Sequence, residues 1–230
     1  MKTAKGMSLT LRALARLLSY PDAALREHLG ELRDALRNEA ALCEQRLTEL
    51  DALIASIERQ SALDAEADYV QLFDSGRSTS LHLFEHVHGD SRDRGPAMID
   101  LARTYEQAGL YLAIGEMPDH LPVVLEYAST QPPREARAFL AEMAHILNAI
   151  FNALDKRASR YASVLAALLE LAGEKVRPVA VADEVPIDEA WAEPLAFDGC
   201  STAGQARPGA AGQSQPIQIV RRGADQGARA

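Results

Sequence analysis

Cysteine is scarce in this sequence, which has only Cys43 and Cys200 among 230 residues. Neither belongs to a C-x-x-C pair, so the sequence predicts neither a thiolate metal site nor a dithiol redox centre. Such usage suits a reducing cytoplasm, where we expect the protein. No apolar run approaches the roughly 18 residues that a membrane-spanning helix needs, so no membrane insertion is predicted. The opening residues MKTAKGMSLT lack the apolar core of a secretory signal.

Basic residues are also under-represented. There are 24 Lys and Arg against 33 Asp and Glu, which gives a net charge of -9. Nucleic-acid binding is not expected, because Lys and Arg must neutralise phosphates. Docking on anionic lipid is disfavoured for the same reason. The charge instead favours a basic or apolar peptide as partner.

Strand patterns are missing, and helical spacing of apolar residues takes their place. No segment shows sustained alternation of apolar and polar residues between hairpin turns. We therefore predict an all-α fold, a globular bundle of about eight or nine helices without a coiled-coil seam. The two clearest helices have apolar residues at 139, 140, 143, 146, 147, 150 and 154, and at 161, 164, 165, 168 and 169.

The composition changes after Gly173, which we expect to end the last helix in a left-handed conformation. The helical domain is thus predicted to span residues 8–173. Residues 174–230 are rich in Pro, Gly and Ala and are predicted to be a largely disordered tail. Within this tail, DEAWAEPLAF holds the only tryptophan, Trp191. That segment either folds back on the helical body or is a short motif for a partner.

Three histidines and a glutamate fall within seven residues, in LHLFEHVHGD. His82, Glu85 and His86 match H-x-x-E-H, a zinc signature in which two histidines share one helix face and the glutamate activates water. A zinc-dependent hydrolase is therefore one alternative. Gly89-Asp90 ends the segment early, and no third ligand stands out from the many carboxylates. The other alternative, which we favour, is a structural loop whose histidines and Glu85 form hydrogen bonds around it.

Two longer motifs resemble a known family. YVQLFDSGRSTSLHLFEHVHGDSRDRGPAMIDL, residues 69–101, resembles the signature of the NarJ-type assembly chaperones of respiratory nitrate reductase. EMPDHLPVVLEYA, residues 116–128, resembles the second signature of the wider family of redox-enzyme maturation chaperones. The opening LLSYPD also fits, and the resemblance covers roughly residues 8–197. One departure is Tyr127, where phenylalanine is more usual.

The resemblance implies an all-helical chaperone with no catalytic residue, no metal and no cofactor of its own. Such a chaperone binds the N-terminal segment of the catalytic alpha subunit of nitrate reductase. It thereby permits insertion of the client's cofactor, bis-molybdopterin guanine dinucleotide, and prevents premature docking on the membrane subunit. The oligomeric state is left open, as is a plain scaffolding role.

The second motif supplies the residues expected to contact the client. Asp119 and His120 match the family's Asp-His pair, which the resemblance implicates in client binding. Asp119 would accept a hydrogen bond or salt bridge from the client, and the charge of His120 would make affinity depend on pH. Asp119 could instead cap the helix that follows it. Glu116 and Glu126 would attract a basic client, or else form a solvated surface.

The first motif adds Tyr69, Leu72 and Phe73, which match the family's Y-x-x-L-F. Their spacing places them on one face of a short helix. An apolar and aromatic face of this kind suits a helix-in-groove mode of peptide binding. The alternative for all three is the hydrophobic core.

Overall fold

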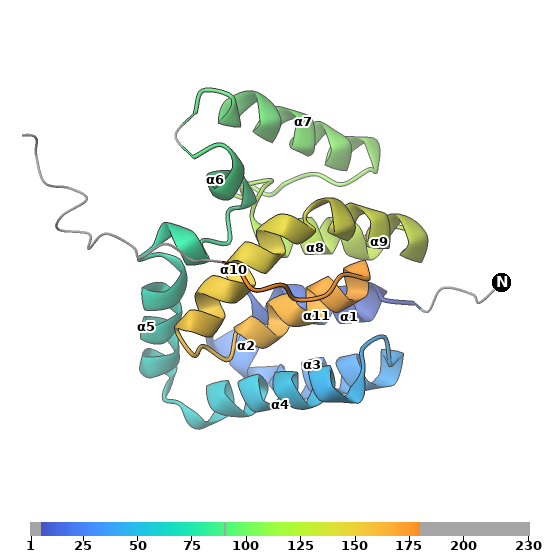
Figure 1. The fold of residues 1–230 in the computed structure, drawn as a ribbon. Coiled ribbons are helices and arrows are strands. Elements are labelled where there is room, and N and C mark those ends of the chain that lie inside the picture. Colours follow the sequence, from blue (N-terminus) through green and yellow to red (C-terminus); the bar gives the residue numbers. More distant parts are fainter. Residues whose placement is uncertain (1–5, 90, 180–230) are drawn as a thin grey trace, which may run out of the picture. The chain divides into compact units, whose positions relative to one another are not determined.

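The computed structural model describes residues 6–89 and 91–179. The chain divides into two compact units, residues 1–184 and 185–230, and everything described here belongs to the first. Trp191, Cys200 and most of the predicted tail lie outside the described residues. Eleven α-helices and one 3-10 helix make up the described part, without a strand, so the all-α prediction is confirmed (Figure 1). The helices are α1 (Ser8–Leu17), α2 (Ala23–Glu27), α3 (Leu29–Glu39), α4 (Glu44–Arg59), α5 (Ala62–Phe73), α6 (Leu83–Val87), α7 (Arg94–Gln107), α8 (Leu121–Thr130), α9 (Pro133–Glu142), α10 (Ala144–Lys156) and α11 (Ala162–Ala172), with η1 (Arg77–Thr79) between α5 and α6.

The number of helices exceeds the eight or nine expected, partly because single residues interrupt two runs of helically spaced apolar residues. His28, with φ -101° and ψ 9°, separates α2 from α3. Met143, with φ -92° and ψ 0°, separates α9 from α10. Apolar spacing continues across both positions, so the sequence pattern gives no sign of either break.

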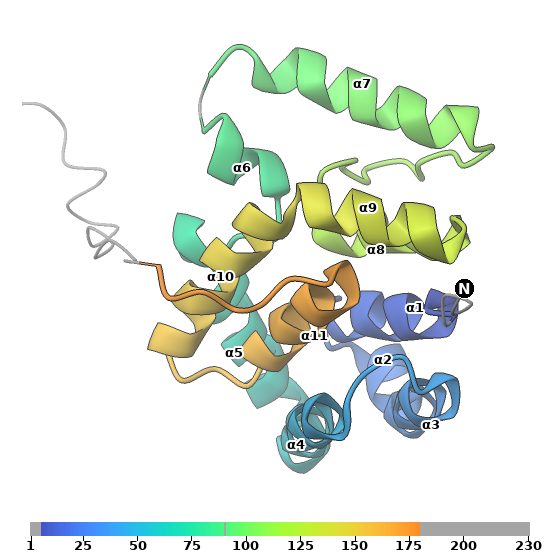
Figure 2. The same cartoon turned by 45° about the vertical axis from the view of Figure 1, so that its right-hand side comes forward.

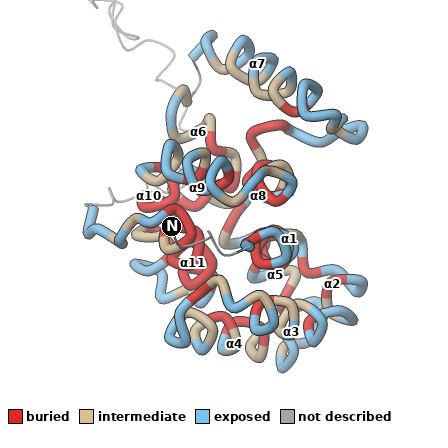
Figure 3. Tube along the Cα trace, turned by 90° about the vertical axis from the view of Figure 1, so that its right-hand side faces the viewer, coloured by how far each residue is buried: buried red, intermediate tan, exposed pale blue. Residues whose placement is uncertain are grey.

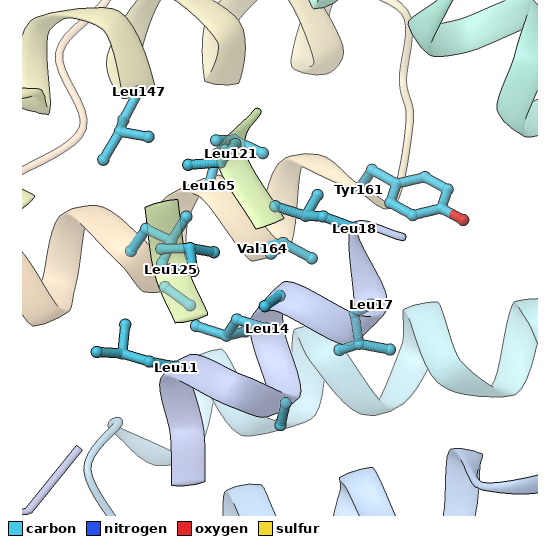
Figure 4. Packing of buried hydrophobic residues seen from close by; sticks show 14 of the residues in the cluster. Leu11, Leu14, Leu17, Leu18, Leu121, Leu125, Leu147, Tyr161, Val164 and Leu165 are labelled. Carbon is cyan, nitrogen blue, oxygen red and sulfur yellow. The ribbon is translucent and has the colours of Figure 1, made fainter. Parts of the chain in front are cut away.

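Helix α11 is the centre of the core. Ten of its eleven residues are buried, as expected for a helix that is apolar all round. It packs against α10, α9 and α4, while α1 packs against α8 and α3. Figure 4 shows Leu14 of α1, Leu125 of α8 and Leu165 of α11 meeting in this core. Gly173 ends α11 with φ 83°, as predicted.

Contacts from distant parts of the chain hold the start of the first helix. Ser8 is the first residue of α1, and its hydroxyl donates to the carbonyl of Ser129 at 2.7 Å. The N–H groups of Leu9 and Thr10, in the first turn of α1, donate to the carboxylate of Glu39. This long-range cap ties α1 to the end of α3, and Ser8 ties it to α8.

The chain continues in ordered contact beyond Gly173. Asn148 and Asn152, one turn apart on α10, form hydrogen bonds with the main chain of Arg177 at 2.8–2.9 Å. Asn152 also accepts a bond from the N–H of Val179 at 3.2 Å. Residues 174–179 of the predicted tail therefore lie against α10.

Candidate functional site

A groove of about 550 Å³ lies between α1, α8 and the segment that joins α7 to α8. It brings together Glu116 and Glu126, both expected to contact the client, although they are ten positions apart. Both glutamates are exposed, so they contribute negative charge to the rim. Four further side chains that line the groove bear on its chemistry: Arg12, Tyr105, Tyr111 and Tyr127.

Aromatic rings form one wall of this groove. The ring centroids of Tyr105 and Tyr127 are 4.8 Å apart, and the ring of Phe139 lies 5.1 Å from that of Tyr127. The hydroxyl of Tyr105 donates to the carbonyl of Pro118 at 2.8 Å. Burial raises the pKa of Tyr105, so its hydroxyl stays a neutral donor near pH 7. The wall is thus a preformed apolar surface.

The segment before α8 exposes large apolar side chains beside the groove. Tyr111 is 81% exposed, and Ile114 and Met117 are exposed as well. The carboxylate of Glu116 accepts a hydrogen bond from the N–H of Ala113 at 2.9 Å, which fixes it against this segment. Exposed apolar groups rimmed by charge are typical of interaction sites.

Asp119 does not cap α8, which was one alternative, and it does not reach the groove. Its side chain is fully buried. One carboxylate oxygen lies 3.2 Å from Nδ1 of His82, and the other accepts the N–H of Phe84 at 3.2 Å. Because Phe84 is in the first turn of α6, Asp119 caps that helix instead. The guanidinium of Arg94 lies 3.7 Å from the same carboxylate.

Two short segments are paired side by side around this carboxylate. His82 and His120 form an isolated antiparallel bridge. The N–H of Leu83 donates to the carbonyl of Asp119 at 3.0 Å, and that of Leu121 donates to the carbonyl of Leu81 at 2.8 Å. The two imidazole rings stack with centroids 5.1 Å apart. The bridge therefore joins the histidine-rich stretch to the start of α8.

The titratable groups in this cluster shift one another's pKa values. Burial acts to raise the pKa of Asp119, but the hydrogen bond and charge of His82, the N–H of Phe84 and the charge of Arg94 outweigh it and hold the pKa below its ordinary value. The hydrogen bond to Asp119 raises the pKa of His82 despite its partial burial. Burial, and then the positive charge of His82, lower the pKa of His120. The two stacked imidazoles thus have opposite preferences for a proton.

We expect the stability contributed by the charge of His82 to depend on pH. A raised folded-state pKa means that this contribution is fully present below the unfolded value of about 6.5, and is lost as the pH rises through the folded value. His82→Gln keeps a donor for Asp119 but cannot be charged. Urea unfolding should therefore show a larger loss of stability at pH 5 than at pH 8.5, with a difference below about 1 kcal/mol because the side chain is partly exposed. The exposed His28, changed to Gln, is the control; equal losses for His82→Gln at the two pH values would contradict the expectation.

The geometry required of a zinc-binding helix is not formed by the histidine-rich stretch. Helix α6 begins at Leu83, so His82 precedes it and turns to Asp119, while Nε2 of His86 lies 2.9 Å from the carbonyl oxygen of Ser80. The carboxylate of Glu85 lies 3.4 Å from the guanidinium of Arg94. Among the described residues, no three His, Cys, Asp or Glu side chains cluster as a metal site would require.

Tyr69, Leu72 and Phe73 lie away from the groove. Tyr69 and Phe73 are only 6% and 5% exposed, and they pack with Tyr161. The hydroxyl of Tyr69 donates to the carbonyl of Leu18 at 2.7 Å. Leu72 is half-buried and lines a separate cavity of about 410 Å³. The structure thus places two of these three residues in the core.

Three residues of the groove carry no sequence pattern that marks them as site residues: Arg12, Tyr105 and Tyr111. Arg12 is 104 positions before Glu116, so no local pattern connects the two. Tyr105 lies four positions after Leu101, a spacing that indicates one helix face but does not indicate a groove. Tyr127 was noted in the sequence, because phenylalanine is more usual at that position of the motif. Its ring is part of the aromatic wall.

Comparisons with known proteins decide the family. A family model described as the nitrate reductase delta subunit matches residues 19–167. The chain belongs to this family. It is 43% identical over 185 residues to the nitrate reductase molybdenum cofactor assembly chaperone NarJ of Escherichia coli K12, covering 80% of this chain and 78% of that protein. The predicted membership among the NarJ-type chaperones is confirmed.

Other relatives within this family are more distant. The probable assembly chaperone NarW of the same strain is 37% identical over 179 residues, covering 78% of this chain and 74% of that protein. The probable NarJ of Bacillus subtilis is 32% identical over 164 residues, covering 70% and 86%. The crystal structure of a redox enzyme maturation protein from Archaeoglobus fulgidus has the same fold, with a TM-score of 0.51, 21% identity, and coverage of 73% of this chain and 94% of that one. Within the described residues of this family member, no helix is both long and apolar enough to cross a membrane.

Proposed function

We propose that this chaperone binds the N-terminal segment of the catalytic alpha subunit of a nitrate reductase in the groove between α1 and α8. The bound client stays receptive to bis-molybdopterin guanine dinucleotide and does not dock early on its membrane subunit. The names of the relatives reported above support a nitrate reductase as the client and a molybdenum cofactor as the group that is inserted. The chaperone itself has no proposed catalytic residue, metal or cofactor, and it acts in the cytoplasm.

The observation that carries this proposal is the composition of the groove. An aromatic wall of Tyr105 and Tyr127 adjoins the exposed Tyr111, and Glu116 and Glu126 add negative charge at the rim. A volume of about 550 Å³ holds several side chains rather than a whole helix. Such a surface fits the apolar side of an amphipathic helix whose flanking residues are basic.

The other expected site residues take indirect roles in this proposal. Asp119 positions the bridge between residues 81–83 and 119–121, and through it the start of α8, because its carboxylate is buried and its bonds are internal. His120 is the N-cap residue of α8, and the positive charge of His82 helps to lower its pKa. Tyr69 and Phe73 hold α5 in the core, and Tyr105, which is equally buried, packs against Tyr127. The client contacts assigned here are therefore those of Glu116, Glu126, Tyr111 and Tyr127.

Reversing the two rim charges tests the proposal. Glu116→Lys with Glu126→Lys should weaken binding of a peptide made from the first residues of the alpha subunit by about 10- to 100-fold in isothermal titration calorimetry at low salt. Each exposed ion pair contributes about 0.2–1 kcal/mol, and reversal replaces attraction with repulsion. Higher salt should shrink the difference, since exposed charges are screened.

The matched control is Glu27→Lys with Glu142→Lys, which makes the same charge change on exposed residues that do not line the groove. In a titration at about 0.15 M salt, this variant should keep an affinity within about twofold of the wild type, because exposed charges farther apart than a Debye length of about 8 Å are largely screened. Equal affinities for the two double variants would contradict a client site at this groove. Absence of any binding by the wild-type protein would contradict the proposed client.

A further inference from the structure

Side-chain contacts hold helix α7 at both of its ends. At its start, the guanidinium of Arg94 lies 3.4 Å from the carboxylate of Glu85 and 3.7 Å from that of Asp119. Near its end, the ring of Tyr105 packs on Tyr127 at 4.8 Å. Both sets of contacts involve side chains of the site already described, Asp119 at the start of α7 and Tyr127 near its end.

Between these ends, α7 has an apolar side that is only partly covered. Met98, Leu101 and Ala102 are half-buried, and together with Tyr105 they repeat at helical spacing. Tyr105 is the only buried residue of this helix, and no residue of α7 belongs to the hydrophobic core cluster of the described chain. Figures 1 and 2 show α7 at the edge of the helical body, and Figure 3 shows it almost entirely half-buried or exposed. Movement of this helix would therefore disturb little of the core.

The connections on both sides of α7 contain glycines in the left-handed region. Gly89 has φ 53° and Gly109 has φ 79°. A Cβ added at either position would meet no heavy atom within 4 Å, so the space beside each glycine is open. Glycine adopts this region without steric cost, and it also crosses between regions more readily than other residues. Gly89 and Gly109 can thus absorb a change in the position of α7.

We propose that α7 is a clamp that opens at Arg94 and closes its apolar side over the client helix. This rests on the proposed function, because the occupant is the same alpha-subunit segment that enters the groove. Tyr105 belongs to both the apolar side of α7 and the lining of the groove, so the two surfaces are continuous. A client helix lying in the groove extends its apolar side onto Met98 and Leu101. Binding on two sides selects a segment with a broad apolar surface.

Hydrogen exchange in the free, full-length protein tests the clamp without any client. The main-chain N–H groups of α7 should exchange faster than those of α8, and Arg94→Ala should accelerate α7 about tenfold, since bonds to a charged group are lost. Arg94→Lys should restore part of the protection. Arg103→Ala is the matched control, because Arg103 pairs with Asp100 within the same helix, at 3.5 Å. Protection of α7 equal to that of α8, or equal effects of the two alanine variants, would overturn the clamp.

A synthetic peptide from the first residues of the alpha subunit then tests its purpose. A peptide of about 15 residues spans about 22 Å as a helix. Its binding should slow exchange in both α8 and α7 and should abolish the difference between Arg94→Ala and the wild type. Protection of α8 alone would overturn the clamp and leave the groove as the client site. Absence of binding to wild type would overturn both proposals.

Discussion

Replacing Asp119 with alanine is expected to lower the free energy of unfolding by about 3–5 kcal/mol, the range seen when one partner of a buried charge pair is removed. The carboxylate is fully buried, and it meets His82, Arg94 and the N–H of Phe84. Its removal takes away the counter-charge of Arg94 and the acceptor of His82, and it frees a main-chain donor in the first turn of α6. Native proteins are stable by only about 5–15 kcal/mol, so the loss should be plain in urea unfolding.

The local consequence distinguishes this role from general destabilisation. Under conditions where Asp119→Ala is still folded, the N–H groups of Leu83 and Phe84 should exchange faster, while those in α11 keep their protection. Asp100→Ala, on the exposed face of α7, is the matched control and should change stability by less than about 0.5 kcal/mol. A small loss for Asp119→Ala, similar to that of Asp100→Ala, would contradict the positioning role.

The contacts within this cluster could not be predicted from the sequence. The motif at residues 116–128 marked Asp119 and His120 as important, and the histidine-rich stretch was expected to form hydrogen bonds around a loop. The pairing of His82 with Asp119 joins residues 37 positions apart, and no periodicity encodes such a contact. Burial of Asp119 depends on the same tertiary contact. The sequence therefore indicated that Asp119, Glu116 and Glu126 matter. It did not indicate that Asp119 is buried while the two glutamates lie on the rim of the groove.

The helices were easier to predict because their signal is local. Apolar spacing in residues 161–169 predicted α11 correctly, and Gly173 ends it as expected. The same spacing could not reveal that α7, with Met98, Leu101 and Tyr105 in register, has an apolar side that the body covers only in part. Periodicity reports that a helix has such a side, and only the packed structure shows what the side contacts.

Replacing Phe73 with alanine is expected to cost about 3–5 kcal/mol of stability, as large-to-small changes of buried aromatic residues do. Its ring lies 4.8 Å from that of Tyr69 and 5.1 Å from that of Tyr161, so it joins α5 to the start of α11. Val70 lies on the same helix but is exposed, and Val70→Ala is the matched control with a change below about 0.5 kcal/mol. Thermal or urea unfolding of the two variants measures the difference.

Peptide binding by the same variants separates the two interpretations of the Y-x-x-L-F motif. A core residue affects affinity only through the folded fraction, so Phe73→Ala should bind the client peptide as tightly as the wild type at temperatures where it remains folded. A direct client contact would weaken binding in the folded variant, by about tenfold or more for a buried aromatic anchor. Unchanged affinity is the expected result, because Phe73 is buried and does not line the groove. The motif then stabilises the helical body that supports α7 and α8. A tenfold loss of affinity in folded Phe73→Ala would require a client surface on α5, separate from the groove.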